Sequence, residues 1–369
     1  MNGKKTQEYA DKLVKDGVIP YLDIYASIGQ DCALRYCVSK DGKATGKERL
    51  YLYSATKPMT VTCAMRLVEE GKLSLDDEVA KYLPAFSQPY ILDGNGQKTP
   101  CKNKMTVRHL LTMSAGFTYH VWGGEYRTLI ERAGKTATTQ EIISALAEAP
   151  LAFESGERFE YSLCHDVLAA VIEVASGQRF SAYMQEIIFT PLGMQDSGFH
   201  TEKQAALAPM YISENGKVQP TARSNDLIFT DNYDSGGAGV ISTVEDYAKF
   251  AKTLACGGVA ENGYRLLQEQ TLQAIYACQH ECLAVQNSFT CVQGNEYGYG
   301  LGVRVRLKET DWGLPKGEFG WDGAAGTYLM VDPVRKISVV IGMHVRNWPE
   351  VFQGEHLKIV ECIYKDLGV

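Results

Sequence analysis

The sequence predicts an α/β fold in which one antiparallel sheet is flanked by helices and carries an inserted, mostly helical domain. Strand-like patterns cluster at the two ends of the chain, over residues 20–53 and 299–344. Helical periodicity dominates between them, from about residue 75 to residue 207. The two ends are therefore expected to share one sheet, with the middle of the chain as an insertion.

The opening segment is expected to be a strand meander followed by a buried helix. Strands are predicted at 20–28, 31–38 and 50–53, with a turn at Lys40-Asp41-Gly42 between the last two. The helix is predicted over 54–70, because apolar residues occupy more than one of its faces. Pro58 falls in the first turn, where a missing N–H donor costs no helical hydrogen bond.

The remaining elements follow from periodicity and from glycine and proline positions. Helices are predicted at 107–113, 139–148, 166–176, 181–189, 243–255 and 355–367, and strands at 299–307, 327–331 and 337–344. The expected domains are a discontinuous sheet domain, 1–75 and 220–369, and a helical domain, 76–219.

Composition is that of an ordinary globular protein, with 45% hydrophobic and 22% charged residues in a chain of 369. The net charge of -7, without a run of basic residues, argues against general binding of nucleic acid or of an anionic membrane. Neither a secretory signal nor a long apolar run is recognised, so a cytoplasmic location is expected. The 10 cysteines are scattered, which predicts reduced thiols and no metal site.

The strongest chemical signal is the pair Ser54 and Lys57 at the start of the predicted buried helix. A residue three positions later in a helix lies one turn away on the same face, so Lys57 can reach the hydroxyl of Ser54. A serine becomes a nucleophile when a neighbouring base removes its proton. Burial and the positive end of the helix dipole both favour the uncharged lysine that such a base requires. The pair suggests acyl transfer through a serine ester.

Two further segments carry candidate residues. Tyr161 precedes an amphipathic helix, and its phenol either packs or relays a proton beside a cation such as Lys57. Residues 320–326, Gly-Trp-Asp-Gly-Ala-Ala-Gly, precede a strand. They are either a glycine-rich hairpin turn or a place where a substrate lies along an edge strand and a backbone N–H holds an oxyanion.

Together these three segments resemble the serine β-lactamase and penicillin-binding-protein superfamily, in particular its branch of class C β-lactamase-like esterases. Residues 69–77, 107–116 and 191–194 resemble linking segments of the family, and the resemblance spans most of the chain. It implies a β-lactamase/transpeptidase-like fold with the active site between the sheet domain and the helical domain.

The resemblance also implies roles. Ser54 would be the acylated nucleophile, Lys57 its base, and Tyr161 the group that passes a proton to the leaving group. The backbone N–H groups of Ser54 and Ala324 would form the oxyanion hole. No metal and no cofactor would take part, and the partner would be a small-molecule ester or amide substrate.

Two departures from the family pattern favour esters. Leu163 stands where an asparagine is common, so a polar contact to a substrate amide is missing. Trp321, Asp322 and Gly323 stand where Lys-Thr-Gly or His-x-Gly is common. Without a cation at Trp321 and with an anion at Asp322, a substrate carboxylate is expected to bind weakly.

An aromatic residue at the position of Trp321 is typical of the esterase branch. Trp321, with Tyr119 and Trp122 on a predicted rim loop, is expected to offer an apolar surface to an acyl or alcohol group.

The predicted function is therefore a serine esterase that acts on small or medium carboxylic esters. A β-lactamase or D-amino-acid peptidase of the same superfamily is the alternative enzyme. A catalytically silent sensor or scaffold is the alternative from another class, and fluorophosphonate labelling of Ser54 distinguishes it from the enzymes.

Overall fold

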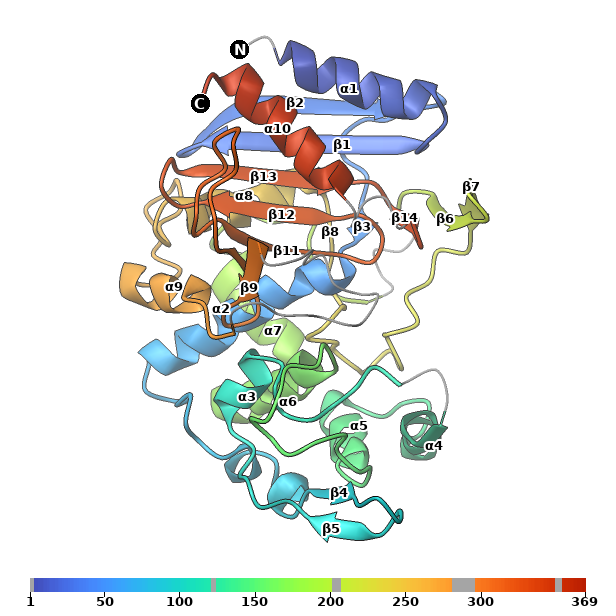
Figure 1. The fold of residues 1–369 in the computed structure, drawn as a ribbon, viewed down its shortest axis with the longest axis vertical. Helices are drawn as coiled ribbons and strands as arrows, with labels where there is room; N and C mark the ends of the chain where they lie inside the picture. Colours follow the sequence, from blue (N-terminus) through green and yellow to red (C-terminus); the bar gives the residue numbers. More distant parts are fainter. Residues whose placement is uncertain (1–2, 121–123, 201–206, 281–295, 349–353) are drawn as a thin grey trace.

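A seven-stranded antiparallel sheet forms one half of the molecule, drawn at the top of Figure 1. The structure is a computed structural model, and it describes residues 3–120, 124–200, 207–280, 296–348 and 354–369. The strand order is β2-β1-β13-β12-β11-β10-β9. The strands span Tyr21–Ile28 (β1), Asp31–Ser39 (β2), Tyr297–Tyr299 (β9), Arg304–Arg306 (β10), Phe319–Asp322 (β11), Tyr328–Asp332 (β12) and Ile337–Gly342 (β13). The predicted α/β class with an antiparallel sheet is confirmed.

Helices surround this sheet and make up most of the other half of the molecule. The α-helices span Lys4–Lys15 (α1), Lys57–Glu69 (α2), Val107–Leu111 (α3), Gly124–Ala133 (α4), Thr139–Leu146 (α5), Cys164–Ser176 (α6), Phe180–Met184 (α7), Val244–Ala255 (α8), Glu269–Tyr276 (α9) and His356–Leu367 (α10). Shorter helical turns are Tyr53–Thr56 (η1), Val79–Lys81 (η2), Pro84–Ser87 (η3) and Gln185–Phe189 (η4).

Within the described residues, three small sheets accompany the large one. Their strands span Leu50–Tyr51 (β3) with Ile241–Ser242 (β8), Tyr90–Leu92 (β4) with Lys98–Pro100 (β5), and Val345–Arg346 (β14) with Met210–Glu214 (β6) and Lys217–Thr221 (β7).

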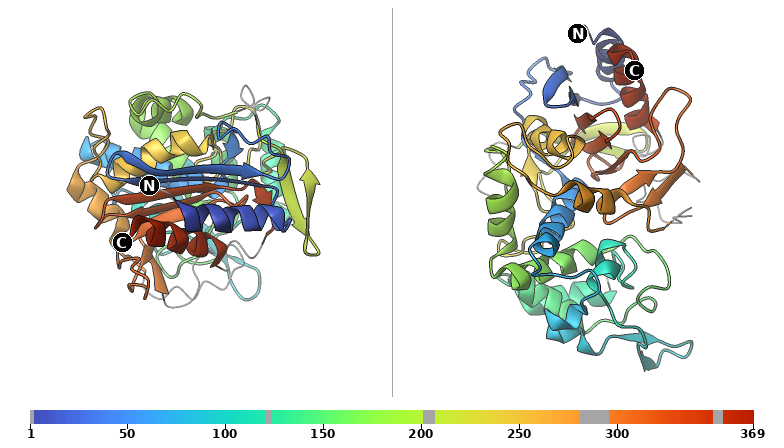
Figure 2. Two further views of the ribbon diagram at one scale, coloured as in Figure 1. Left: turned by 90° about the horizontal axis from the view of Figure 1, so that it is seen from above. Right: turned by 90° about the vertical axis from the view of Figure 1, so that its left-hand side faces the viewer.

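The large sheet is buried on both faces. Helices α1 and α10 cover one face and α8 covers the other, as the view from above in Figure 2 shows. Residues 337–342 of the interior strand β13 are accordingly all buried, and four of these six residues are isoleucine or valine. The two termini lie side by side, where Asp366 accepts hydrogen bonds from the backbone of Lys5 and Thr6.

Helix α2 runs between the large sheet and the helices α3, α5, α6 and α7 (Figure 1). It is buried over residues 57–65 and at Leu67, as expected for a helix with apolar residues on several faces. Residues at its N-terminal end therefore lie where both halves of the molecule meet. The domain boundaries near residues 75 and 219 remain a prediction.

The structure differs from the predicted elements in several places. Helix α1 was missed, because its buried stripe contains only a few apolar residues among many charges. The strand β3 pairs with β8 and does not extend the opening meander. The predicted strand 299–307 is a hairpin, β9 and β10, whose turn contains Gly302 with a positive φ of 74°.

In the part of the chain that the structure describes, every helix is too short or too polar to cross a membrane.

Candidate active site

The predicted nucleophile lies in a short helical turn at the end of the segment that leads from the sheet into α2. Ser54 is part of η1, and the α-helix begins at Lys57, slightly later than predicted. Tyr53, which directly precedes Ser54, has a φ of 47°, a left-handed conformation that is uncommon for an aromatic residue. The Tyr53 hydroxyl donates to the carbonyl oxygen of Ser224 at 2.8 Å, which fixes this turn. Ser54 is partly exposed between buried neighbours, so a substrate can reach its hydroxyl.

The Lys57 amine reaches three oxygen atoms. Its Nζ lies 3.1 Å from Ser54 Oγ, 3.0 Å from the Tyr119 hydroxyl and 2.9 Å from the carbonyl oxygen of Gly237. The Lys57 residue is 0% exposed. A buried amine that contacts the serine hydroxyl has the geometry required of a base for that hydroxyl.

Tyr161 also lies against this amine. Lys57 Nζ is 4.7 Å from the centroid of the Tyr161 ring. The indole Nε1 of Trp321 donates to the Tyr161 hydroxyl oxygen at 3.0 Å, and the two rings pack with centroids 5.3 Å apart. The structure thus brings Ser54, Lys57 and Tyr161 together, with Trp321 acting directly on the phenol.

The third motif approaches the nucleophile through a glycine. A Cβ on Gly323 would lie 2.1 Å from the carbonyl oxygen of Leu52, so only glycine allows β11 to meet the segment before Ser54 this closely. Gly323 also closes the turn between β11 and β12, since its N–H donates to the carbonyl oxygen of Thr327 at 2.7 Å. Ala324 follows and is partly exposed.

The residues predicted to contact substrate are placed differently. Trp321 and Leu163 are each 1% exposed, so their side chains present almost no surface to a ligand. Tyr119 is half-buried and directs its hydroxyl at Lys57. Burial raises the pKa of Tyr119 well above its ordinary value, which keeps it a neutral phenol. Trp122 lies outside the described residues.

Asp322 does not present a free charge to the site. Arg304 Nη1 lies 3.0 Å from Asp322 Oδ1, and Arg304 Nη2 lies 3.0 Å from Glu318 Oε1, with all three side chains buried. The guanidinium neutralises the carboxylate, so the predicted repulsion of a substrate carboxylate by Asp322 loses its basis.

Sequence reasoning missed two contributors to the lysine environment. The carbonyl oxygen of Gly237 accepts from Lys57, and the buried carboxylate of Asp166 binds the N–H of Gly237 at 3.3 Å. The available signals were the glycine cluster at residues 236–239 and an aspartate in the first turn of a buried helix. These signals do not show that the loop at residues 236–239 contacts the Lys57 amine, because that contact depends on the tertiary fold.

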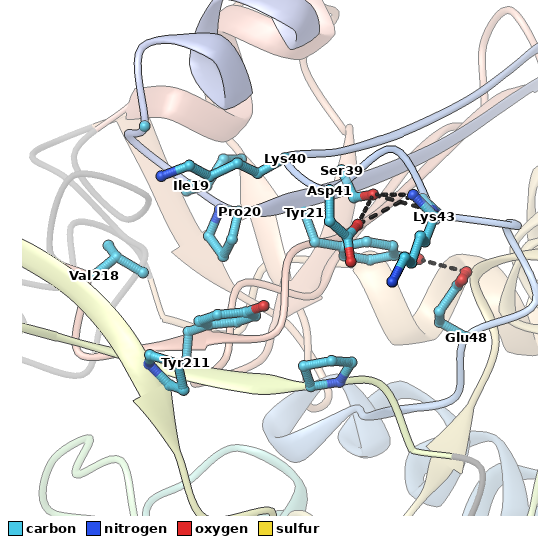
Figure 3. A pocket seen from close by; sticks show the side chains of 14 residues that line it. Ile19, Pro20, Tyr21, Ser39, Lys40, Asp41, Lys43, Glu48, Tyr211 and Val218 are labelled. Atoms are coloured by element: carbon cyan, nitrogen blue, oxygen red, sulfur yellow. Dashed lines mark hydrogen bonds between the residues drawn. The ribbon is translucent and has the colours of Figure 1, made fainter.

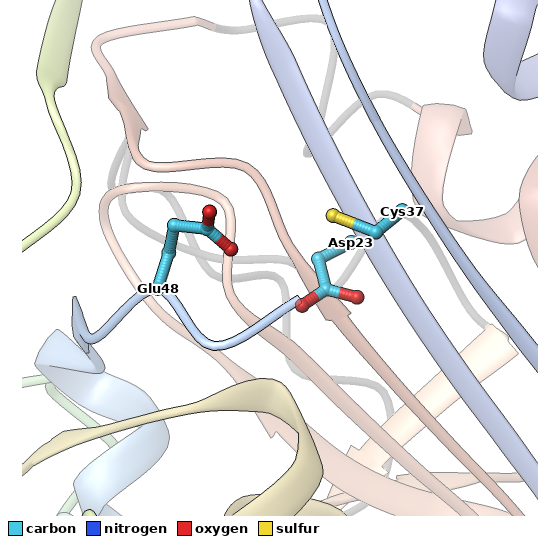
Figure 4. A group of neighbouring side chains, drawn as sticks. All are labelled: Asp23, Cys37 and Glu48. Atoms are coloured by element: carbon cyan, nitrogen blue, oxygen red, sulfur yellow. The ribbon is translucent and has the colours of Figure 1, made fainter. Parts of the chain in front are cut away.

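Other polar groupings lie apart from these residues. A cavity of about 600 Å³ between the start of β1 and the β6–β7 hairpin is lined by Tyr21, Lys43, Glu48 and Tyr211, among others (Figure 3). In the described part of the chain, Asp23, Cys37 and Glu48 gather in an arrangement of metal-ligand types (Figure 4). Both carboxylate oxygens of this aspartate are already bound by a guanidinium, that of Arg35.

Comparisons with known proteins agree with this geometry. The family model described as Beta-lactamase matches residues 27–360. Esterase EstB of Burkholderia gladioli is 28% identical, over 81% of this chain and 78% of its own. The lovastatin esterase of Penicillium rubens is 26% identical, over 77% of this chain and 76% of its own.

The fold is also found among solved structures. The structure titled EstCE1, a hydrolase with promiscuous acyltransferase activity, superimposes with a TM-score of 0.80 at 24% identity and covers 98% of both chains. The family model alone spans most of the sequence. The chain belongs to the Beta-lactamase family.

Proposed function

We propose that the protein is a serine hydrolase that cleaves carboxylic esters through an acyl-serine intermediate. The observation that carries the proposal is the 3.1 Å contact between Lys57 Nζ and Ser54 Oγ, made by an amine that is 0% exposed. The relatives named as esterases support the choice of an ester bond.

In the acylation step, Ser54 Oγ attacks the ester carbonyl carbon and its proton passes to an uncharged Lys57. The N–H groups of Ser54 and Ala324 hold the oxyanion of the tetrahedral intermediate. When the bond to the alcohol oxygen breaks, that oxygen takes a proton from Tyr161, which regains one from Lys57. The alcohol leaves, and the acyl group remains on Ser54.

In the deacylation step, water attacks the acyl carbon and gives its proton to the Lys57–Tyr161 pair. The pair returns a proton to the Ser54 oxygen as the carboxylic acid departs. The indole N–H of Trp321 stabilises negative charge on the Tyr161 oxygen while its proton is away. Ser54, Lys57 and Tyr161 therefore return to their starting protonation states after each turnover.

A preference for esters over amides rests on Leu163. Its buried apolar side chain supplies no hydrogen bond to a substrate amide, whereas an ester carbonyl and alcohol oxygen require none at that position. The pairing of Asp322 with Arg304 removes charge repulsion as a second argument.

The test is hydrolysis of p-nitrophenyl acetate and butyrate, with fluorophosphonate labelling followed by mass spectrometry. We expect turnover, label on Ser54, and loss of both in a folded Ser54→Ala variant. Nitrocefin and D-alanyl peptides are assayed in parallel, and a clear preference for either would replace the esterase proposal by the corresponding enzyme. A wild-type protein that is neither labelled nor active would identify a silent sensor or scaffold.

A further inference from the structure

A buried acid, Asp166, lies directly behind the lysine of the candidate site. It belongs to the first turn of α6 and is 2% exposed. Its Oδ1 accepts from the Tyr233 hydroxyl at 2.8 Å, from Ser235 Oγ at 2.6 Å and from the N–H of Gly237 at 3.3 Å. Three donors on one oxygen are the environment of an ionised carboxylate.

The same contacts connect Asp166 to Lys57. Gly237 gives its N–H to the carboxylate and receives a hydrogen bond from Lys57 Nζ on its carbonyl oxygen, at 2.9 Å. A Cβ on Gly237 would lie 2.4 Å from Asp166 Oδ2, so the turn and the carboxylate are fitted to each other. Asp166 thus holds in place one of the oxygen atoms that the amine contacts.

The charges of Asp166 and Lys57 also couple the two residues. Burial raises the pKa of Asp166, while the Ser235 hydrogen bond and the positive charge of Lys57 oppose that rise. Because such coupling is reciprocal, the Asp166 carboxylate favours the protonated form of Lys57.

Other titratable groups face the amine or the aspartate behind it. Tyr119 and Tyr161 lie against Lys57, Cys164 and His165 lie near its charge, and Tyr233 donates to Asp166. Burial raises the pKa of Cys164 to about 11 and those of Tyr119 and Tyr233 well above their ordinary values. Burial, with a smaller contribution from the Lys57 charge, lowers the pKa of His165 well below its ordinary value, so this ring stays neutral.

We infer that Asp166 is a positioning residue that orients Lys57 through Gly237 and stabilises the ammonium that forms when Lys57 takes the Ser54 proton. The inference rests on the proposed function and adds that Asp166 raises the basicity of Lys57, the proposed base. The logic is that of any base whose protonated form is held by a buried acid.

The test is the pH dependence of kcat/KM for a p-nitrophenyl ester in Asp166→Asn, with the fluorophosphonate labelling rate as a second readout. Loss of the carboxylate makes Lys57 a weaker base. We expect the limb of the profile that reports Lys57 to move to lower pH by about one unit, and the plateau to fall by about tenfold or more.

Asp234→Asn is the matched control. Asp234 is also fully buried, but its carboxylate pairs with Arg179 and touches neither Lys57 nor Gly237 in the described contacts. This variant should lose stability and keep the pH midpoint of the wild type. If Asp166 had a purely structural role, Asp166→Asn would also lose stability and keep the wild-type pH midpoint. The midpoint therefore distinguishes a structural role from a positioning role.

An unmoved midpoint, or one that moves to higher pH, in folded Asp166→Asn overturns the inference while the proposed function stands. If Asp166→Asn does not fold, Asp166→Ala is measured by the same criterion. If neither variant folds, Asp166 has a structural role only, and the inference is overturned. A wild-type protein without labelling or turnover overturns the proposed function and this inference together.

Discussion

The indole nitrogen of Trp321 donates to the hydroxyl oxygen of Tyr161 at 3.0 Å. The indole is 1% exposed and is packed edge-on by Tyr299 at a centroid distance of 5.3 Å, so its orientation is fixed. An N–H aimed at a phenol oxygen stabilises that oxygen when it carries negative charge. The aromatic residue of the third motif therefore supports the proposed proton relay from inside the protein.

Replacing Trp321 by phenylalanine should keep most of the packing and remove the donor. We expect kcat for an ester to fall by about tenfold with little change in KM, because the hydrogen bond matters most when the phenol has lost its proton. Steady-state kinetics measures this change. Trp312→Phe, in the cluster beneath α10, is the matched control and should leave kcat unaltered; an unaltered kcat in Trp321→Phe as well would contradict the relay.

Gly323→Ala tests the close approach of the third motif to the nucleophile. The new Cβ would lie 2.1 Å from a backbone oxygen, that of Leu52, which cannot move without displacing the turn before Ser54. We expect kcat/KM to fall by about 100-fold and the free energy of unfolding to fall by about 1–3 kcal/mol.

Gly94→Ala serves as the control for Gly323→Ala. Its Cβ would meet no atom within 4 Å, so both activity and stability should stay near those of the wild type. Equal kinetics for the two alanine variants would show that the approach of Gly323 to Leu52 does not position the site.

The sequence allowed the fold class and the contact between Ser54 and Lys57 to be predicted because both depend on local patterns. Ser54 and Lys57 are in contact because a helical turn brings residues three positions apart onto the same face. The strand β11 was not among the predicted strands, because the glycine-rich residues 320–326 left a hairpin turn and a substrate-binding stretch as alternatives; pairing with β12 fixes it as a strand.

The roles of side chains in the third motif could not be predicted in the same way. Trp321 and Asp322 point into the protein, where their partners are Tyr161, 160 residues away in the sequence, and Arg304, 18 residues away. Burial of a charged residue with its counter-ion leaves no local signature. The contact between Lys57 and the Gly237 carbonyl is likewise a property of tertiary structure alone.

Asp322→Asn distinguishes a structural carboxylate from one that repels substrate. Because Asp322 is paired with Arg304, its loss should lower the free energy of unfolding by about 2 kcal/mol. The ratio of kcat/KM for a neutral ester to that for a carboxylate-bearing ester should change by less than about twofold.

Urea unfolding and paired kinetics on the two esters measure these effects in Asp322→Asn. Glu131→Gln, in a pair with Arg127 that is exposed on both sides, should change stability by less than about 0.5 kcal/mol. A marked gain of activity on the carboxylate-bearing ester in Asp322→Asn would restore the repulsion expected from the sequence.

Asp234 should contribute stability that disappears in acid. Burial would raise the pKa of Asp234, but hydrogen bonds from His200, Arg179 and Ser181 outweigh it and lower the pKa to about 2. A carboxyl whose pKa is lower in the folded protein stabilises it above its ordinary pKa of 3.8, and this contribution fades as the pH falls from about 4 to about 2. Its size at neutral pH is about 2 kcal/mol.

Urea unfolding of the wild type and Asp234→Asn between pH 7 and pH 3 measures the contribution of Asp234. The difference in unfolding free energy should be largest at pH 7 and should shrink below about pH 4, since the wild-type carboxyl loses its advantage as protons bind the unfolded chain. Asp231→Asn, at an exposed position of the same loop, should show no such pH dependence. A difference that stays constant over this range would mean that Asp234 stabilises the fold by shape and not by charge.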